Sequence, residues 1–141
     1  MENITKLKIE KPAKEIFEAI VDPIKIGNFW FSSSSERWEQ GKTITIRYDE
    51  YNAEGQIEIV EIKENKKIVF HDYDNHTVTI TLEEQSPSST IIEVIEDGFD
   101  ENDSELIEKL IDNKEGWVYA LTCLKGYLEF GVTKLRAALV K

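Results

Sequence analysis

The amino-acid sequence predicts an α+β domain in which a curved antiparallel sheet is closed by a long helix near the carboxyl end. In residues 114–131, apolar side chains recur three and four positions apart, as one buried helix face requires. Between residues 41 and 96 the apolar residues instead alternate, which is typical of strands with one buried face. A chain of 141 residues fits one domain, predicted over residues 1–141, and can bury a sizeable core.

The predicted long helix has an apolar face that needs a partner surface. This face consists of Trp117, Ala120, Leu121, Leu124, Tyr127 and Leu128. Asp112 and Glu115 resemble a capping box at a helix start, and Gly131 stands where helices often end. Gly116 and Gly126 each cost about 1 kcal/mol relative to alanine inside a helix, so we expect a close backbone approach there. The strands supply the partner surface.

The amino-terminal residues predict one strand and two short helices. Residues 3–10 alternate as a strand with one solvated face. Pro12 suits the first turn of a helix, where its missing N–H is not needed, and Pro23 ends that helix. Residues 23–28 are expected to form one more helical turn. The next segments are an aromatic cluster, residues 29–31, and a run of four serines, residues 32–35, expected to be a loop.

The middle of the chain predicts successive strands joined by short turns. The strands are expected near residues 43–48, 56–62, 68–70, 78–82 and 90–96, with turns at 49–53, 65–66, 74–75 and 86–88. Connections this short join antiparallel neighbours, so the strands should form a meander. A short amphipathic helix is expected over residues 106–111, separate from the long helix, and a final short helix over residues 132–141.

The composition limits the classes of partner. The formal net charge of −11, from 17 basic and 28 acidic residues, argues against nucleic acid and against anionic membranes, which both attract basic surfaces. The acidity indicates either simple solubility or a basic protein partner. No stretch has the length of a membrane span, and the amino terminus lacks the apolar run of a signal peptide. The single cysteine, Cys123, excludes an internal disulfide and favours a reducing, cytoplasmic setting.

The predicted order of a strand, two short helices, a run of antiparallel strands and a closing helix is the helix-grip arrangement. Particular residues sharpen this: Phe29-Trp30, Gly55, Ile68-Val69-Phe70, the strand from Val78 to Leu82, Gly98-Phe99, and Gly116-Trp117 leading into Leu121, Leu124, Leu128 and Gly131. Together these motifs resemble the AHSA1-like family, relatives of the carboxy-terminal domain of the activator of Hsp90 ATPase, within the START/SRPBCC superfamily. The resemblance extends over nearly the whole chain.

The resemblance implies a deep, largely apolar cavity between the curved sheet and the closing helix. The residues indicate the same, because a bent sheet and a straight helix leave a gap in which small molecules often bind. Strand parity and the helix face give the apolar candidates for the cavity wall: Trp30, Ile46, Tyr48, Phe70, Val78, Ile80, Ile92, Val94, Trp117 and Leu121. The alternative is that these side chains simply fill a core.

Few residues offer chemistry. His76 belongs to a predicted turn and is expected to be exposed, and His71 is expected on the outer sheet face, opposite Phe70. No His/Cys cluster has metal-ligand spacing, and no nucleophile elbow or phosphate loop occurs, so neither a metal nor a cofactor is predicted. Parity places Asp72 and Glu96 at strand ends facing inward, where two carboxylates could share a proton or bind a cation. The favoured alternative is that both point into water at the rim.

Three hypotheses for function follow. The leading one is a non-enzymatic binding or carrier domain for a small hydrophobic molecule, as a monomer or homodimer. The family name suggests the second, a chaperone (Hsp90)-associated interaction module. The third, from the superfamily, is a cyclase- or hydrolase-type enzyme whose cavity supplies shape and whose few polar groups supply chemistry. No catalysis through histidine or cysteine is expected, but a shielded, hydrogen-bonded Asp72 or Glu96 inside the cavity would favour the enzyme over the carrier.

Overall fold

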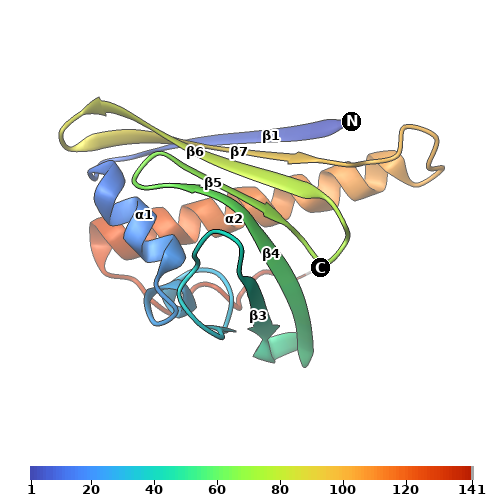
Figure 1. The fold of residues 1–141 in the computed structure, drawn as a ribbon, viewed down its shortest axis with the longest axis horizontal. Helices are drawn as coiled ribbons and strands as arrows, with labels where there is room; N and C mark the ends of the chain where they lie inside the picture. The colour runs from blue at the N-terminus through green and yellow to red at the C-terminus, as the bar shows by residue number, and fades with distance from the viewer. Residues whose placement is uncertain (141) are drawn as a thin grey trace.

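The computed structural model describes residues 1–140 of the chain (Figure 1). The strands are β1 (Glu2–Ile9), β2 (Ser33–Ser34), β3 (Thr43–Tyr48), β4 (Ala53–Lys63), β5 (Lys67–His71), β6 (Thr77–Ser86) and β7 (Ser89–Asp97). The helices are α1 (Ala13–Val21) and α2 (Leu106–Phe130), with two 3-10 turns, η1 (Lys25–Asn28) and η2 (Asp49–Tyr51). Among these residues, no helix has the length and apolar character needed to cross a membrane.

The seven strands form one antiparallel sheet in the order β1-β7-β6-β5-β4-β3-β2. From β3 to β7, strands consecutive in the chain pair with each other, which is the predicted meander, and β1 pairs with β7 at the far edge. Register shifts between Ile59 and Glu61 and between Glu84 and Ser86 mark bulges, which bend the strands that carry them. Figure 1 shows β3 and β4 curving away from β1 and β7, with α2 crossing behind the sheet.

Strand β6 illustrates how alternation builds the core. Val78, Ile80 and Leu82 are buried, while the threonines between them are partly exposed. The buried side chains belong to one apolar cluster with Leu121 and Leu124 of α2 and the apolar side of α1. Complete burial of such a side chain contributes about 1.5–3 kcal/mol relative to exposure. The sheet, α1 and α2 therefore enclose a single core.

The closing helix is longer than predicted. α2 begins at Leu106, so the short helix expected over residues 106–111 and the long helix expected from residue 114 are one helix of 25 residues. The capping box expected at residue 112 therefore lies inside a helix. Half-buried side chains continue one face across the expected boundary, at Leu106, Leu110, Asn113 and Trp117. Because this spacing of four, three and four residues keeps one side toward the sheet, nothing in the packing requires a break.

The carboxy-terminal segment also differs from the prediction. α2 ends at Gly131 as expected, because this residue has a left-handed conformation (φ 69°) that glycine adopts without strain. The final helix is a wrong prediction for residues 132–140, which contain none; residue 141 lies outside the described residues. This segment is held by tertiary contacts, since Arg136 Nε donates a hydrogen bond of 2.6 Å to the Trp30 carbonyl oxygen.

Two short connections have more structure than predicted. The expected serine loop contains β2, in which Ser33 and Ser34 pair with β3, because the free edge of β3 can accept even a short polar segment. The turn expected over residues 49–53 is the 3-10 turn η2, ended by Asn52 in a left-handed conformation (φ 48°). Glu50 and Tyr51 of η2 line the hollow between the sheet and α2.

Candidate functional site

A cavity of about 1040 Å³ lies between the curved part of the sheet, the first half of α2 and the carboxy-terminal segment. Its wall takes residues from β3 to β7, from α2 and from the segment that follows η1. The aromatic members of the wall are Phe29, Trp30, Phe31, Tyr48, Tyr51, Phe70, Tyr73, Phe99, Trp117 and Tyr119. A space of this size and character suits a small organic molecule with an apolar body.

Trp30 stands at the centre of the aromatic wall. Its ring centroid lies 4.3 Å from that of Phe31, 6.2 Å from that of Phe70 and 5.1 Å from that of Trp117. Such aromatic pairs add about 0.5–1.5 kcal/mol each beyond the burial of their area. Burial raises the pKa of the Tyr48 phenol, which keeps this hydroxyl protonated in the same wall at neutral pH. The wall thus combines flat apolar surfaces with a neutral polar group.

Glu96 provides a buried charge at the polar end of the cavity. The residue is 6% exposed, and both of its carboxylate oxygens have partners. Trp117 Nε1 donates to Glu96 Oε1 at 3.0 Å, and His76 Nδ1 lies 2.8 Å from Glu96 Oε2. The expectation that Glu96 points into water is therefore wrong.

His76 is likewise not the exposed turn residue that was expected, since its side chain is only 18% exposed. The reason is strand register. Val78 of β6 pairs with Glu96 of β7, so His76, two residues before Val78, projects on the same sheet face as Glu96. The turn expected at residues 74–75 ends before His76, whose carbonyl oxygen accepts a hydrogen bond from the Asp72 N–H at 2.9 Å.

Gly98 and Phe99 hold the His76 ring in place. The ring centroids of Phe99 and His76 lie 4.5 Å apart. Gly98 has φ 124°, and a Cβ at this position would lie 2.9 Å from His76 Cδ2, closer than real Cβ atoms approach. Only glycine fits here without displacing the ring. The Gly98-Phe99 pair, which the sequence offers as a family motif, is therefore also a signal for an ordered histidine.

Asp72 completes the polar end of the cavity. One of its carboxylate oxygens, Oδ1, accepts hydrogen bonds from the backbone N–H groups of Asp74 and His76, both at 2.9 Å. Burial raises the pKa of Asp72, the bond from the His76 N–H lowers it, and repulsion from Glu96 raises it further. Asp72 is half-buried rather than free in water. Three side chains therefore converge here: Asp72, His76 and Glu96. Each offers one atom that could bind a metal ion, and the three atoms lie within 4.8 Å of one another.

The predicted site residues divide into two groups. The cavity wall contains Trp30, Ile46, Tyr48, Phe70, Asp72, Val78, Glu96 and Trp117. The remaining four, Ile80, Ile92, Val94 and Leu121, are buried in the core instead. Register groups three of these four, because Ile80 pairs with Val94 and Leu82 with Ile92 in adjacent strands. None of these side chains lines the cavity.

The other candidates for chemistry lie away from the cavity. His71 is exposed at the end of β5, with Nδ1 3.9 Å from Glu58 Oε2. Cys123 is buried in α2, and burial raises the pKa of its thiol, which keeps it protonated and unreactive at neutral pH. Neither side chain lines the cavity.

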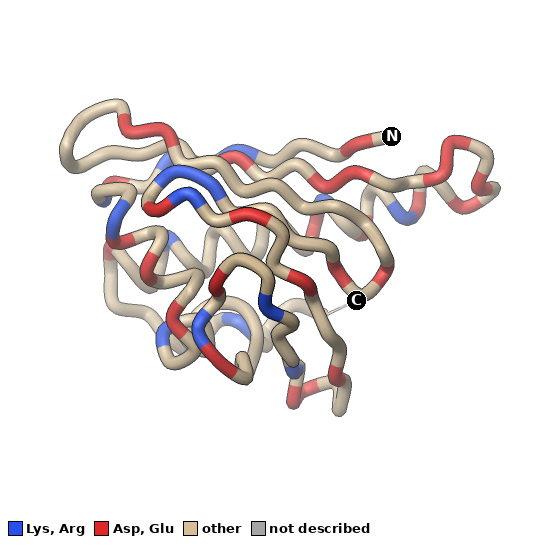
Figure 2. Tube along the Cα trace, viewed as in Figure 1, with Lys and Arg blue, Asp and Glu red and all other residues tan. Residues whose placement is uncertain are grey.

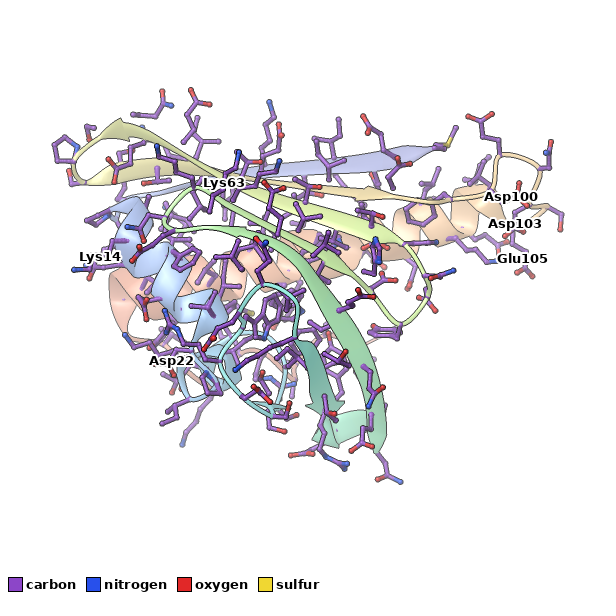
Figure 3. All side chains as sticks on the ribbon, in the orientation of Figure 1. Lys14, Asp22, Lys63, Asp100, Asp103 and Glu105 are labelled. Atoms are coloured by element: carbon purple, nitrogen blue, oxygen red, sulfur yellow. The ribbon has the colours of Figure 1, made fainter. Side chains whose placement is uncertain are left out.

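The cavity wall is acidic. Its ionisable members are Glu50, Glu54, Asp72, Asp74, Glu96, Glu105, Glu108 and Asp112, against Lys109 and Arg136, with His76 beside them. Both basic side chains have acidic partners, since Arg136 pairs with Glu50 at 2.6 Å and Lys109 with Asp103 at 2.5 Å. Figure 2 shows acidic positions gathered in the loop before α2, and Figure 3 labels Asp100, Asp103 and Glu105 there. A ligand entering here meets a field that favours positive charge.

These features define the class of protein: an α+β helix-grip domain with a hollow between its curved sheet and its closing helix. The family model described as "Activator of Hsp90 ATPase homolog 1-like protein" (AHSA1) matches residues 10–129. The chain belongs to this family. Among curated proteins, none matches the chain.

Solved structures agree with the family. The chain is similar to protein SSP2350 from Staphylococcus saprophyticus, with 52% identity, a TM-score of 0.85, and coverage of 94% of this chain and 95% of that one. It also resembles the Aha1 dimer from Colwellia psychrerythraea (16% identity, TM-score 0.78, 93% and 98% covered). An AHSA1-like protein from Aeromonas hydrophila is similar as well (15% identity, TM-score 0.74, 93% and 94% covered). The two distant likenesses establish the fold alone.

Proposed function

We propose that this chain is an enzyme of the cyclase or hydrolase type, in which the aromatic cavity binds a small, flat, largely apolar molecule and the His76–Glu96 pair transfers a proton to or from it. The observation that carries this proposal is Glu96, which is buried in the cavity wall and hydrogen-bonded through both oxygens. Burial of a carboxylate costs several kcal/mol unless partners hold it, and a passive apolar carrier has no use for such a group. The buried, hydrogen-bonded position of Glu96 therefore favours the enzyme hypothesis over the carrier hypothesis.

The binding step uses the aromatic wall. Trp30 and Trp117 come from different elements, and their rings lie 5.1 Å apart at an interplanar angle of 58°. A flat ligand in the cavity would contact both indoles, and burial of its apolar surface would contribute about 25 cal/mol per Å². The phenol of Tyr48 is available to orient a polar group on the ligand.

The chemical step uses the His76 ring. In the tautomer of His76 that carries its proton on Nδ1, this N–H donates a hydrogen bond to Glu96. Nε2 then has a free lone pair, so it can accept a proton and later donate it. Glu96 fixes the ring orientation and stabilises the imidazolium that forms when His76 acts as a base. General acid–base catalysis of this kind typically contributes 10²- to 10⁴-fold in rate, and both hydrolysis and cyclisation require such a proton transfer.

The other hypotheses rest on less. The chaperone-associated module rests on the name of the family, to which no contact among residues 1–140 adds support. A homodimer is proposed only by analogy with the protein from Colwellia psychrerythraea, whose structure is that of a dimer. Light scattering of the purified chain would measure its oligomeric state. The carrier hypothesis needs only the aromatic wall, whereas the enzyme hypothesis also needs Glu96.

Native mass spectrometry of protein taken directly from cells tests binding and chemistry together. The wild-type chain is expected to retain a small molecule in its converted form. Glu96→Gln keeps an oxygen that can accept from Trp117 but removes the charge, so this variant is expected to retain the unconverted molecule, with a different mass. Glu58→Gln is the matched control, because it removes the carboxylate beside the exposed His71 instead.

The outcomes separate the hypotheses. The same bound molecule on all three proteins would return the chain to the carrier hypothesis. No retained molecule, together with tryptophan emission that stays unchanged through titrations with flat aromatic compounds and fatty acids, would overturn binding itself.

A further inference from the structure

We propose that Asp72, His76 and Glu96 form a binding site for one divalent transition-metal ion of the Zn²⁺ type. This goes beyond the proposed function, because the ion would bind whether or not an organic molecule occupies the cavity. Asp72 and His76 lie four residues apart in the connection between β5 and β6, and Glu96 lies near the end of β7. The pairing of β6 with β7 brings Glu96 to the other two, so spacing in the sequence does not show the complete site.

The donor set suits this class of ion. Imidazole nitrogen with two carboxylate oxygens is a ligand combination that Zn²⁺ accepts, whereas Mg²⁺ and Ca²⁺ prefer oxygen ligands alone. Bonds of about 2.0–2.2 Å in tetrahedral geometry place ligand atoms roughly 3.3 Å apart. Here the ligand atoms lie within 4.8 Å of one another, and His76 Nδ1 lies 2.8 Å from Glu96 Oε2. Small side-chain rotations therefore suffice to close the site around an ion.

Neighbouring groups already hold the three side chains. Two backbone N–H groups fix Asp72 Oδ1, so Oδ2 remains for the ion. Phe99 and Gly98 confine the His76 ring. The Trp117 indole donates to one oxygen of Glu96, the type of supporting hydrogen bond that orients metal ligands. Such preorganisation lowers the entropic cost of binding.

Charge favours a cation at this position. Asp72 and Glu96 are close enough to repel each other. The basic side chains of the cavity wall do not compensate them, because Arg136 pairs with Glu50 and Lys109 with Asp103. A divalent ion bound between His76 Nδ1 and Glu96 Oε2 would replace their hydrogen bond and would offset the charge of both carboxylates.

An ion held by three protein ligands keeps a coordination position for water or for a ligand in the cavity. This is the arrangement of catalytic rather than structural zinc sites. Zn²⁺ lowers the pKa of its bound water to near neutrality, so in the loaded protein the zinc-bound hydroxide left when this water loses a proton to solvent would act as the base in place of His76. The reaction class proposed above is unchanged, and only the group that moves the proton differs.

Calorimetric titration of Zn²⁺ into tag-free protein, stripped of metal with a chelator, tests the site. We expect one ion per chain. Asp72→Asn, His76→Gln and Glu96→Gln should each weaken binding by about 100-fold or more, since each removes a direct ligand. Asp72→Asn keeps the Oδ1 acceptor of the turn, so it should fold normally by circular dichroism. Trp117→Phe removes only the supporting N–H and should weaken binding by about 10-fold.

The second histidine–glutamate pair supplies the control. His71→Gln and Glu58→Gln remove the same groups from the exposed face and should leave the affinity for Zn²⁺ unchanged. The proposal is overturned if the wild-type chain binds no Zn²⁺, if Glu96→Gln and Asp72→Asn bind as tightly as wild type, or if the exposed pair accounts for the binding. A mass difference between wild-type and Glu96→Gln adducts without Zn²⁺ binding would overturn the metal site alone. Zn²⁺ binding without that difference would overturn only the proposed enzyme.

Discussion

The interior of this domain has a solid half and a hollow half. In the solid half, Ile80, Ile92, Val94 and Leu121 belong to the core cluster that includes the apolar side of α1, and all of them are almost completely buried. In the hollow half, β3 and β4 curve away from β1 and β7, and aromatic rings line a cavity of about 1040 Å³. Both halves use alternating apolar strand residues, so the residue pattern does not distinguish them. What differs is how much space the backbone leaves between the sheet and the helices for side chains to fill.

The comparison also shows where polar groups can survive in the interior. The side chains that make up the solid half are apolar and give a carboxylate no hydrogen-bond partners. At the far end of the hollow half, Glu96 is buried and has both Trp117 and His76 as partners. A hollow region therefore tolerates buried charge that a packed region would expel. The four predictions below test this contrast, from the largest expected effect to the smallest.

Ile80→Ala in the solid half should lower the free energy of unfolding by about 3 kcal/mol, because it leaves a void in a packed core. Ile46→Ala at the cavity wall should cost less, nearer 2 kcal/mol, because the adjoining cavity gives the surrounding side chains room to close the new void. Urea denaturation measures both values, with Val60→Ala, at an exposed strand position, as the control. Equal losses at Ile80 and Ile46 would contradict the division into two halves.

Gly98→Ala should destabilise the fold by about 2 kcal/mol. It combines strain at φ 124° with a contact of 2.9 Å to the His76 ring. Gly41→Ala is the matched control, because Gly41 also has positive φ (89°) but nothing lies within 4 Å of its added Cβ. Thermal unfolding should show the smaller loss for Gly41→Ala, and only Gly98→Ala should shift the imidazole NMR signals of His76. A larger loss at Gly41 would remove the argument for a packed histidine.

Arg136→Gln should cost about 1.5 kcal/mol and loosen the segment that closes the hollow half. Arg136 is mostly buried and bridges the Trp30 carbonyl oxygen and Glu50. Arg47→Gln removes an exposed arginine that also has two acidic neighbours, and should cost less than 1 kcal/mol. Acrylamide quenching of tryptophan should rise only in Arg136→Gln. Unchanged quenching there would show that the segment does not cover the cavity.

Glu58→Gln should change the free energy of unfolding by less than about 0.5 kcal/mol, because its partner His71 is exposed and 3.9 Å away. Glu96→Gln should instead shift the tryptophan emission, since it alters the partner of the Trp117 indole. Denaturation and fluorescence spectra of the two variants provide the comparison. A stability loss above 1 kcal/mol for Glu58→Gln would mean that the exposed His71–Glu58 pair contributes to stability as a buried pair such as His76–Glu96 would.

Much of the fold could be predicted from local pattern. Alternation identified the strands from β3 to β7, and Gly131 identified the end of α2. The start of α2 was predicted incorrectly because a capping-box pattern at Asp112 and Glu115 occurs inside a continuous helix. The tail was predicted incorrectly because helical spacing in residues 132–140 competes with contacts such as that of Arg136 to Trp30. In both places tertiary packing outweighed a local signal.

The sequence by itself determined which residues are apolar on alternate positions and that neighbouring strands are antiparallel, and strand parity put Asp72 and Glu96 on the inward side without deciding whether they are buried or in water. These follow from periods of 2 and 3.6 residues, which are local properties of the backbone. Only the tertiary structure decided which inward residues fill the core and which line a cavity, and that His76 joins Glu96. Those outcomes depend on sheet curvature and on the pairing of β6 with β7, which join residues about 20 positions apart in the chain.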